Sequence, residues 1–143
     1  AEALLMAADR AQHVAEVIVP ALDAGRHVVC DRYLGSSVAY QGFGRGLPPD
    51  EIRHLSVWAT DGLLPDVVVL LTVPSDVADR RLGGASDRIE DAGAAFHQRV
   101  ADGFTAQAAE DPSRWVVVDG TGSKSDVAAA VWAAVSERLG WPT

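Results

Sequence analysis

Hydrophobic positions follow a helical period over the first part of the chain. Apolar residues recur there every three or four positions, at Leu4, Ala7, Ala11, Val14 and Ile18. This spacing places them on one face of a helix. Pro20 is expected to bend the helix near its end and Gly25 to stop it, because glycine is favoured just beyond a helix C-terminus. We therefore predict a helix from residue 1 to residue 24.

Three short runs of consecutive apolar residues follow a different pattern. They are His27–Cys30, Val67–Val73 and Trp115–Val118. Runs without polar alternation are typical of strands that are buried on both faces of a parallel sheet. Cys30, inside the first run, is therefore expected to be an inert apolar filler. Three tryptophans are also expected in the core: Trp58, Trp115 and Trp132.

Helical patterns separate and follow these strands. The stretch 42–49, rich in glycine and proline, is expected to be irregular. The predicted helices begin at Gly35–Ser37, with a serine as N-cap, and continue at Asp50–Thr60, Ser75–Leu82, Phe96–Ala109 and Lys124–Leu139. Strands that alternate with helices predict an α/β fold, a three-layer parallel sheet with helices on both faces, in a single domain over residues 1–143.

The predicted sheet is small for this fold class. Three strands are fewer than the roughly five or six that such sheets usually have. The chain also begins within helix-forming sequence and without Met. We therefore expect a sheet that is truncated at its N-terminal side.

Composition and charge exclude several function classes. Hydrophobic residues make up 48% of the chain and charged residues 22%, as in ordinary globular domains. A net charge of −8 disfavours binding to nucleic acid polymers and to anionic membranes. No apolar run approaches the ~20 residues of a membrane helix. The single cysteine cannot form an internal disulfide and fits a reducing compartment, so we expect a cytoplasmic protein.

Polar residues with candidate chemistry begin at the end of the first predicted strand. Asp31 and Arg32 lie where open α/β sheets bind their ligands. The carboxylate can hold a metal-bound water and the arginine can reach a phosphate, although a structural Asp–Arg pair is the alternative. Ser36 follows, and three further residues on one helix face offer a hydroxyl, a ring and an amide to a flat polar ligand: Ser37, Tyr40 and Gln41.

A second group of charged residues flanks Gly83–Gly84. Arg80 and Arg81 precede this pair, and Arg88 and Glu90 follow it. Arginines on a flexible segment can close over a polyphosphate as a lid. The alternative is a solvated end of a surface helix.

Neither of two glycine-rich stretches fits a phosphate loop. Val118 and Ser123 stand where the pattern G-x-x-x-x-G-K-[ST] needs glycine. The stretch Gly42–Gly46 does not directly follow a strand, as a dinucleotide loop would. The histidines have no metal-ligand spacing: His13, His27, His54 and His97.

Taken together, these segments resemble bacterial thymidylate kinases. The similarity extends over essentially all 143 residues. It rests on stretches in the family's order and spacing: Leu4–His13, Asp31–Tyr33, Ser36–Ser37, Ala39–Gly46, Ala59–Leu63, Pro65–Asp66, Asp87–Glu90 and Asp111–Pro112. The resemblance implies the fold of a P-loop nucleoside monophosphate kinase and the phosphorylation of dTMP to dTDP by ATP and Mg²⁺, in dTTP biosynthesis. It also implies a homodimer that packs through helices such as Glu2–Ala24.

The resemblance implies a dTMP pocket. Arg10 corresponds to an arginine that hydrogen-bonds a thymine carbonyl, and Arg32 to the one that holds the dTMP phosphate. Tyr40 corresponds to a ring beside the sugar. The other residues expected at dTMP are Met6, Ser36, Ser37 and Gln41.

The resemblance also implies the catalytic and ATP-binding groups. Asp31, Arg32 and Arg88 are the expected catalytic residues, with Asp31 a candidate Mg²⁺ ligand through water. The lid is expected around residues 80–92, with Arg80, Arg81, Arg88 and Glu90 toward ATP. The loop from Gly120 to Gly122 is expected to hold adenine.

The chain departs from the family at several points. Met6 stands where a phenylalanine usually stacks on thymine, so we expect weaker stacking. The segment around Gly83–Gly84 is short for a lid. The family's first strand, phosphate loop and second strand would precede Ala1, so the chain alone is expected to lack kinase activity.

Two other functions stay open. One is a non-catalytic module for thymidine-nucleotide binding or dimerisation, and the other is a kinase of another nucleoside monophosphate.

Overall fold

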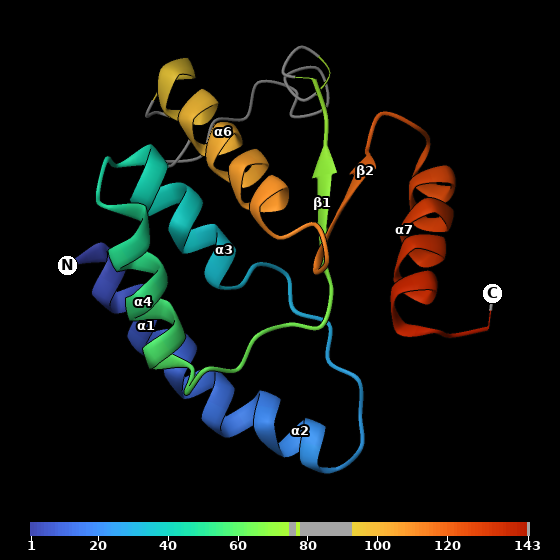
Figure 1. Ribbon diagram of the computed structural model, residues 1–143, viewed down its shortest axis with the longest axis horizontal. Helices are drawn as coiled ribbons and strands as arrows, with labels where there is room; N and C mark the ends of the chain where they lie inside the picture. The colour runs from blue at the N-terminus through green and yellow to red at the C-terminus, as the bar shows by residue number, and fades with distance from the viewer. Residues whose placement is uncertain (75–76, 78–92, 143) are drawn as a thin grey trace. The chain divides into compact units, whose positions relative to one another are not determined.

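The computed structural model describes residues 1–74, 77 and 93–142 (Figure 1). The chain divides into two compact units, Ala1–Leu64 with Ala94–Phe104 and Pro65–Gly93 with Thr105–Thr143. The predicted helix Ser75–Leu82 lies outside the described residues, apart from Val77. The predicted lid, with Arg80, Arg81, Arg88 and Glu90, lies outside them entirely.

The first unit opens with one nearly continuous helical stretch. It runs through α1 (Glu2–His13), the π-helix η1 (Val14–Ile18) and α2 (Val19–Asp23), which confirms the predicted helix. Pro20 has no N–H to donate to the carbonyl four residues earlier, and its ring would clash with that carbonyl. The wider π turn directly before α2 accommodates this loss, so the helix continues through the proline.

A second helical segment follows in the same unit, made of α3 (Leu34–Ser37) and the π-helix η2 (Val38–Gly44). The expectation of an irregular stretch is therefore wrong for Gly42 and Gly44. A Cβ on Gly44 would lie 2.7 Å from the Phe96 ring, and one on Gly42 would lie 3.1 Å from the Cα of Pro49. Glycine is needed here for close packing, whereas Gly46, with φ +73°, occupies the turn that the composition predicted.

Helix α4 (Pro49–Ala59) and the first part of α6 (Ala94–Glu110) complete this unit. The core forms where η2 meets α6 and consists of Ala39, Phe96 and Val100, with Tyr40 and Phe104 packed against it. Arg99 of α6 donates two hydrogen bonds to the Gly44 carbonyl, at 3.2 and 3.0 Å. These bonds satisfy an orphan carbonyl at the end of η2 and hold that helix in place.

The second unit contains a parallel sheet. Strand β1 (Val68–Thr72) pairs with β2 (Trp115–Asp119) in register from Val68 opposite Trp115 to Thr72 opposite Asp119. Helix α7 (Lys124–Leu139) packs against β2, as Figure 1 shows. Ser123 begins α7 as an N-cap, because its hydroxyl accepts the backbone N–H of Asp126 at 3.2 Å. The α/β class with a parallel sheet is confirmed.

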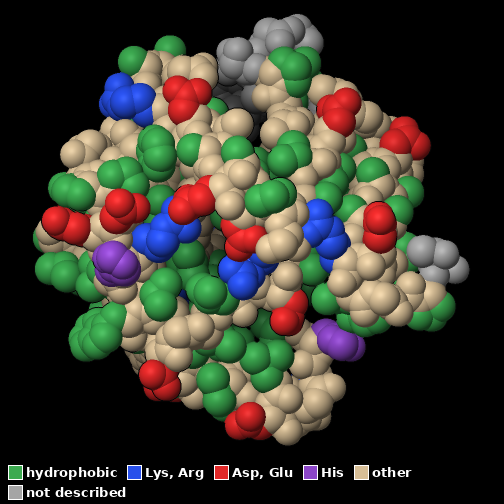
Figure 2. All heavy atoms as spheres, in the orientation of Figure 1, with side chains coloured by type: hydrophobic (Ala, Val, Ile, Leu, Met, Phe, Trp, Pro, Cys, Tyr) green, Lys and Arg blue, Asp and Glu red, His purple; other side chains and the backbone are tan. Residues whose placement is uncertain are grey.

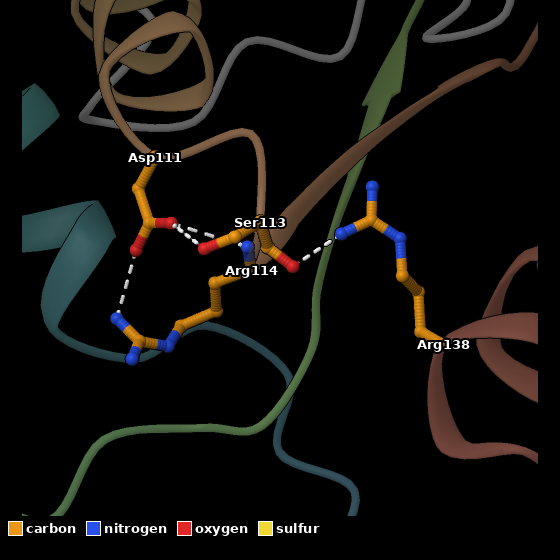
Figure 3. A network of polar contacts seen from close by, with 4 residues as sticks. All are labelled: Asp111, Ser113, Arg114 and Arg138. Atoms are coloured by element: carbon orange, nitrogen blue, oxygen red, sulfur yellow. Dashed lines mark hydrogen bonds and ion pairs between the residues drawn. The ribbon is translucent and has the colours of Figure 1, made fainter.

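A polar turn joins α6 to β2 (Figure 3). Asp111 accepts hydrogen bonds from the Ser113 hydroxyl at 2.5 Å and from Arg114 at its backbone N–H and guanidinium, at 3.2 and 2.9 Å. Arg138 of α7 donates to the Ser113 carbonyl. The Ser113 hydroxyl, ahead of the contacts from Arg114, lowers the pKa of Asp111. The Asp111–Pro112 stretch of the family resemblance is thus a structural turn in this chain.

The predicted strand His27–Cys30 is wrong, and the described residues contain two strands. Val29 is 98% exposed, and Cys30 is exposed, with its thiol donating to the Arg32 carbonyl at 3.2 Å. An apolar run becomes a strand only when a neighbour satisfies its backbone groups. No described residue forms such a ladder with this run, so Cys30 is not a buried filler here.

Two of the tryptophans expected in the core are exposed. Trp58 on α4 is 80% exposed and Trp132 on α7 is 55% exposed, whereas Trp115 in β2 is half-buried. Trp132 packs beside Trp141, with ring centroids 5.9 Å apart. Both exposed rings lie on helix faces that no described element of their own unit covers fully. Size and hydrophobicity alone therefore predicted their burial wrongly.

Candidate functional site

Polar side chains join α1 to the α3–η2 segment in the first unit. Glu2 and Arg10 lie eight residues apart on one face of α1, and Ser37 and Gln41 lie four apart on the facing segment. Arg10 Nη2 donates to Ser37 Oγ at 3.1 Å, and Gln41 Nε2 donates to Glu2 Oε1 at 2.7 Å. Because the partners occur in reverse order, the two segments run antiparallel here. We call these four residues the polar seam.

Arg10 is the charged centre of the polar seam. Its Nη1 atom is buried and has no hydrogen-bond partner among the described residues. Burial lowers the pKa of the guanidinium, with the phenol of Tyr33 acting in the opposite direction, but an arginine stays protonated in proteins. The guanidinium carbon lies 5.6 Å from the centroid of the Tyr33 ring. Since a buried donor without a partner is costly, this N–H group is suited to a ligand acceptor.

Tyr33 anchors the turn that carries Asp31 and Arg32. Its hydroxyl donates to the Leu63 carbonyl at 3.1 Å, and burial raises the pKa of the phenol. Arg32 has φ +67°, a conformation that is uncommon outside glycine and often found at functional sites. Asp31 and Arg32 are both exposed. The turn therefore holds a carboxylate and a guanidinium in solvent at the start of α3.

Tyr40 links this turn to the core. The Arg32 guanidinium carbon lies 5.1 Å from the centroid of the Tyr40 ring. The ring also makes edge contacts with Phe96 and Phe104, at centroid distances of 6.1 and 6.2 Å. Contacts on several sides restrict the ring to one orientation. Tyr40 thus forms a rigid wall beside Arg32.

The backbone at Tyr40 has the wider π geometry. Arg45 N donates to the Tyr40 carbonyl at 2.9 Å, a bond that spans five residues. Single π turns inside helices occur frequently at functional sites. A π turn spans one residue more than an α turn, so it changes which side chains align along η2. It therefore affects how Gln41 faces α1 and how Tyr40 faces α6.

The structure brings together only part of the predicted set. Met6 is half-exposed on α1 between Glu2 and Arg10, and Ser36 is half-buried, with its backbone N–H bonded to Tyr33. Gly120 belongs to the second unit, where a Cβ would lie 2.9 Å from Val73 Cγ2. Sequence reasoning missed Glu2. Its four-residue spacing to Met6 and then to Arg10 was the available signal.

The described residues hold no complete metal-ligand cluster of the usual protein side chains. Across residues 1–74, 77 and 93–142, no group of three or more His, Cys, Asp or Glu side chains could hold a metal ion. Mg²⁺ commonly binds one or two carboxylates together with substrate phosphates. The exposed Asp31 carboxylate fits such a partial ligand set. In the same residues, no helix has both the length and the apolar character needed to cross a bilayer.

Comparisons with known proteins all indicate one family. The sequence model of the family described as thymidylate kinase matches residues 1–131. A thymidylate kinase of Bifidobacterium longum (strain DJO10A) is 53% identical over 139 residues, which are 97% of this chain and 66% of the relative. One of Synechococcus sp. (strain JA-2-3B'a(2-13)) is 50% identical over 139 residues, 97% of this chain and 67% of the relative. One of Clavibacter michiganensis subsp. michiganensis (strain NCPPB 382) is 52% identical over 134 residues, 92% of this chain and 64% of the relative.

These matches cover both compact units in a continuous stretch. The chain spans about two thirds of the length of the curated relatives it matches. Every segment that suggested the resemblance lies within the matched residues 1–131. The chain belongs to the thymidylate kinase family.

Proposed function

We propose that this chain supplies the dTMP-binding part of an enzyme that transfers the γ-phosphoryl group of ATP to dTMP. The bond between the γ-phosphorus and the bridging oxygen of ADP breaks, and a bond to a phosphate oxygen of dTMP forms. The observation that carries the proposal is the buried Nη1 of Arg10, which has no partner among the described residues and belongs to the polar seam. Family membership supports the assignment.

The thymine base would bind at the polar seam. Arg10 holds its guanidinium in place through Ser37 and Tyr33, which leaves Nη1 to donate to a base carbonyl. Met6, on the same face of α1, would cover the flat surface of the base with its thioether. Buried polar groups of this kind reject bases that leave them unpaired. Gln41 and Ser37 would complete the polar edge.

The sugar and phosphate of dTMP would lie along Tyr40 and Arg32. Arg32 offers a planar guanidinium that can grip a phosphate with two parallel hydrogen bonds. Its contact with the fixed ring of Tyr40 limits the positions that it can take. Positioning of this kind supplies most of the rate in phosphoryl transfer, since little covalent help is needed. Ser36 lies four residues after Arg32, within α3.

The ATP side is proposed from the family resemblance. Mg²⁺ would be held by Asp31 through water and would neutralise charge on the phosphates. Arg80, Arg81, Arg88 and Glu90 would act from the lid around residues 80–92. Gly120 would belong to the loop that holds adenine. A side chain at this position would clash with Val73, so glycine lets the loop pack closely against the end of β1. The proposed cofactors are thus ATP and Mg²⁺.

The assembly is proposed to be a cytoplasmic homodimer that packs through α1. Hydrophobic side chains reach the surface around α4 in Figure 2, and a groove of about 350 Å³ lies between α1 and α4. Leu4, Ala11, Leu55 and Trp58 are among its lining residues. Exposed apolar surface of this kind commonly marks a protein interface. Sedimentation of the full-length protein should show twice the monomer mass, and Trp58→Glu should shift it toward the monomer.

A second candidate function is a non-catalytic module that binds thymidine nucleotides or dimerises. It rests on the proposed dTMP-side residues Arg10, Arg32, Ser37 and Tyr40 and needs no ATP-side group. A kinase of another nucleoside monophosphate is the third candidate. Relative rates with dTMP, dUMP and dCMP would identify it.

The direct test is dTMP-dependent release of ADP by the full-length protein with ATP and Mg²⁺. Titration calorimetry on the 143-residue chain separates the alternatives. Binding of dTMP by the chain, together with no dTMP-dependent ADP release by the full-length protein, would support the module, whereas binding of neither nucleotide would contradict the proposed dTMP site.

A further inference from the structure

The contact between Glu2 and Gln41 is part-buried and joins two helical segments, whereas the other amide–carboxylate pairs of the first unit are exposed and lie within one helix. Gln41 is buried, and its Nε2 donates to Glu2 Oε1 at 2.7 Å. The second carboxylate oxygen of Glu2 lies 3.5 Å from Arg45 Nη2. The Arg45 guanidinium in turn lies over the Phe96 ring, 5.0 Å from its centroid. Glu2 is therefore held in place while it contacts the amide of Gln41.

A carboxylate distinguishes the two ends of an amide. A glutamine amide has a donor end, NH₂, and an acceptor end, the carbonyl oxygen, and the two have nearly the same shape. An ionised carboxylate only accepts hydrogen bonds. Rotating the Gln41 amide by half a turn would place two acceptor oxygens against each other at a short distance. Glu2 therefore selects the orientation with Nε2 toward itself.

With the Gln41 amide in this orientation, the polar seam contains one acceptor and one donor without a protein partner among the described residues. In the described part of the chain, no hydrogen bond reaches the side-chain oxygen of Gln41. Arg10 Nη1 is likewise without a partner there, and its Nη2 is bonded to Ser37. Ser37 and Gln41 are one helical turn apart, so the free groups belong to neighbouring positions.

We propose that Glu2 is a positioning residue for base specificity, which acts by fixing the Gln41 amide with its carbonyl oxygen available to the base. The proposal rests on the proposed function of the polar seam as the base site. A donor beside an acceptor matches a base edge with a carbonyl next to a ring N–H, as in thymine and uracil. Cytosine has an amino group next to a bare ring nitrogen and would mismatch both groups.

The mismatch determines the expected size of the effect. A site built to hydrogen-bond a substrate rejects an analogue that leaves its buried groups unpaired, so one lost discriminating group is worth about tenfold to a hundredfold. Glu2→Gln keeps the size of the side chain but removes the acceptor-only character. Both orientations of the Gln41 amide then become accessible, so its carbonyl oxygen faces the base in only part of the molecules.

The test measures kcat/KM for dTMP and for dCMP with the full-length enzyme. Glu2→Gln should lower the ratio of the two values about tenfold, chiefly through the KM for dTMP, while the KM for ATP stays within twofold. Glu16→Gln is the matched control, because Glu16 accepts from the amide of Gln12 at 3.2 Å in the same way but at an exposed position. A ratio unchanged in Glu2→Gln and Glu2→Ala, or equal losses for both nucleotides, would overturn the proposal.

A second measurement does not depend on kinase activity. The side-chain NH₂ protons of Gln41, assigned by their loss in Gln41→Met, should be protected from hydrogen exchange in the wild type. Protection should fall at least tenfold in Glu2→Ala and stay unchanged in Glu16→Ala. Unprotected protons in the wild type would refute the role of Glu2 even in an active kinase. Protected protons in a protein without dTMP activity would refute the proposed function and not the orientation.

Discussion

The polar seam and the turn at Asp111 are both networks of charged and polar side chains, but they differ in how completely they are satisfied. At the turn, the Asp111 carboxylate accepts from Ser113 and Arg114, and Arg138 bonds to the turn's backbone (Figure 3). In the polar seam, Arg10 Nη1 is buried without a partner among the described residues. A network that serves only structure closes on itself, whereas one that binds a ligand keeps free groups at a cost in stability.

The largest expected effect comes from removing the free donor. Arg10→Met should weaken dTMP binding by about tenfold to a hundredfold, since a hydrogen bond to a charged group is worth about 1.5–3 kcal/mol. ATP binding should be unchanged. The free energy of unfolding should change little, because losing the buried group without a partner offsets losing the bond to Ser37 and the contact with Tyr33. Titration calorimetry and urea unfolding measure the two quantities.

Arg138→Met is the matched control for that experiment. It removes an arginine from the closed network instead of the open one. It should leave dTMP affinity unchanged. Equal losses of dTMP and ATP affinity in Arg10→Met would remove Arg10 from the base pocket.

The next effect tests the packing that supports the polar seam. Gly44→Ala would place a methyl group 2.7 Å from the Phe96 ring and 2.9 Å from Val100. Overpacking of this kind costs about 1–3 kcal/mol of unfolding free energy and should lower the Tm. Thermal unfolding by circular dichroism measures this change.

Gly46→Ala provides the comparison for Gly44→Ala. Its Cβ would meet no atom within 4 Å, so only the strain of φ +73° acts. We expect a cost of about 1 kcal/mol there. A larger loss at Gly46 than at Gly44 would contradict the close packing of η2 on α6.

A smaller effect is expected from opening the closed network. Arg138→Met removes the hydrogen bond to the Ser113 carbonyl and a weaker one to Trp115 at 3.5 Å. An ordinary intramolecular hydrogen bond contributes about 0.5–1.5 kcal/mol, so unfolding free energy should fall by about 1 kcal/mol. Urea unfolding followed by tryptophan fluorescence measures it. A loss confined to nucleotide binding would show that the turn has a functional role.

The smallest effect is a change in pH dependence at the same turn. The pKa of Asp111 is lowered from 3.8 in the folded chain, mainly by the Ser113 hydroxyl. Its contribution is therefore present above the unfolded pKa and is lost as the pH falls through the folded value. Asp111→Asn should reduce the drop in urea midpoint between pH 5 and pH 2.5. A drop as steep as in the wild type would contradict the role of Asp111.

The helices could be predicted closely because their signals are local. Helix α7 begins and ends at the predicted Lys124 and Leu139, and the helix predicted at 96–109 lies within α6. The spacing of apolar residues and the capping residues is sufficient for such elements. The prediction of a strand at His27–Cys30 is wrong, because an apolar run alone does not specify a strand. A strand depends on a neighbouring strand from any part of the sequence, whereas a helix satisfies its own backbone.

The candidate site was predicted in part. One-turn spacing placed Ser37 and Gln41 on a shared helix face, and the family resemblance added Arg10. The pairing of Glu2 with Gln41 could not be read from spacing, because the two residues are 39 positions apart. The nucleotide-binding roles of all the site residues stay predictions: Arg10, Ser37, Gln41, Asp31, Arg32, Tyr40 and the lid arginines.

Local sequence by itself determined the family, the helices and the chemical types available for binding. Tertiary structure decided which of those groups are satisfied. Arg10 and Arg138 are the same residue type on similar helices, yet the first keeps a buried N–H free and the second closes a turn. The physical reason is that burial and hydrogen bonding depend on packing between distant segments. Residue type sets only how many bonds a side chain can make.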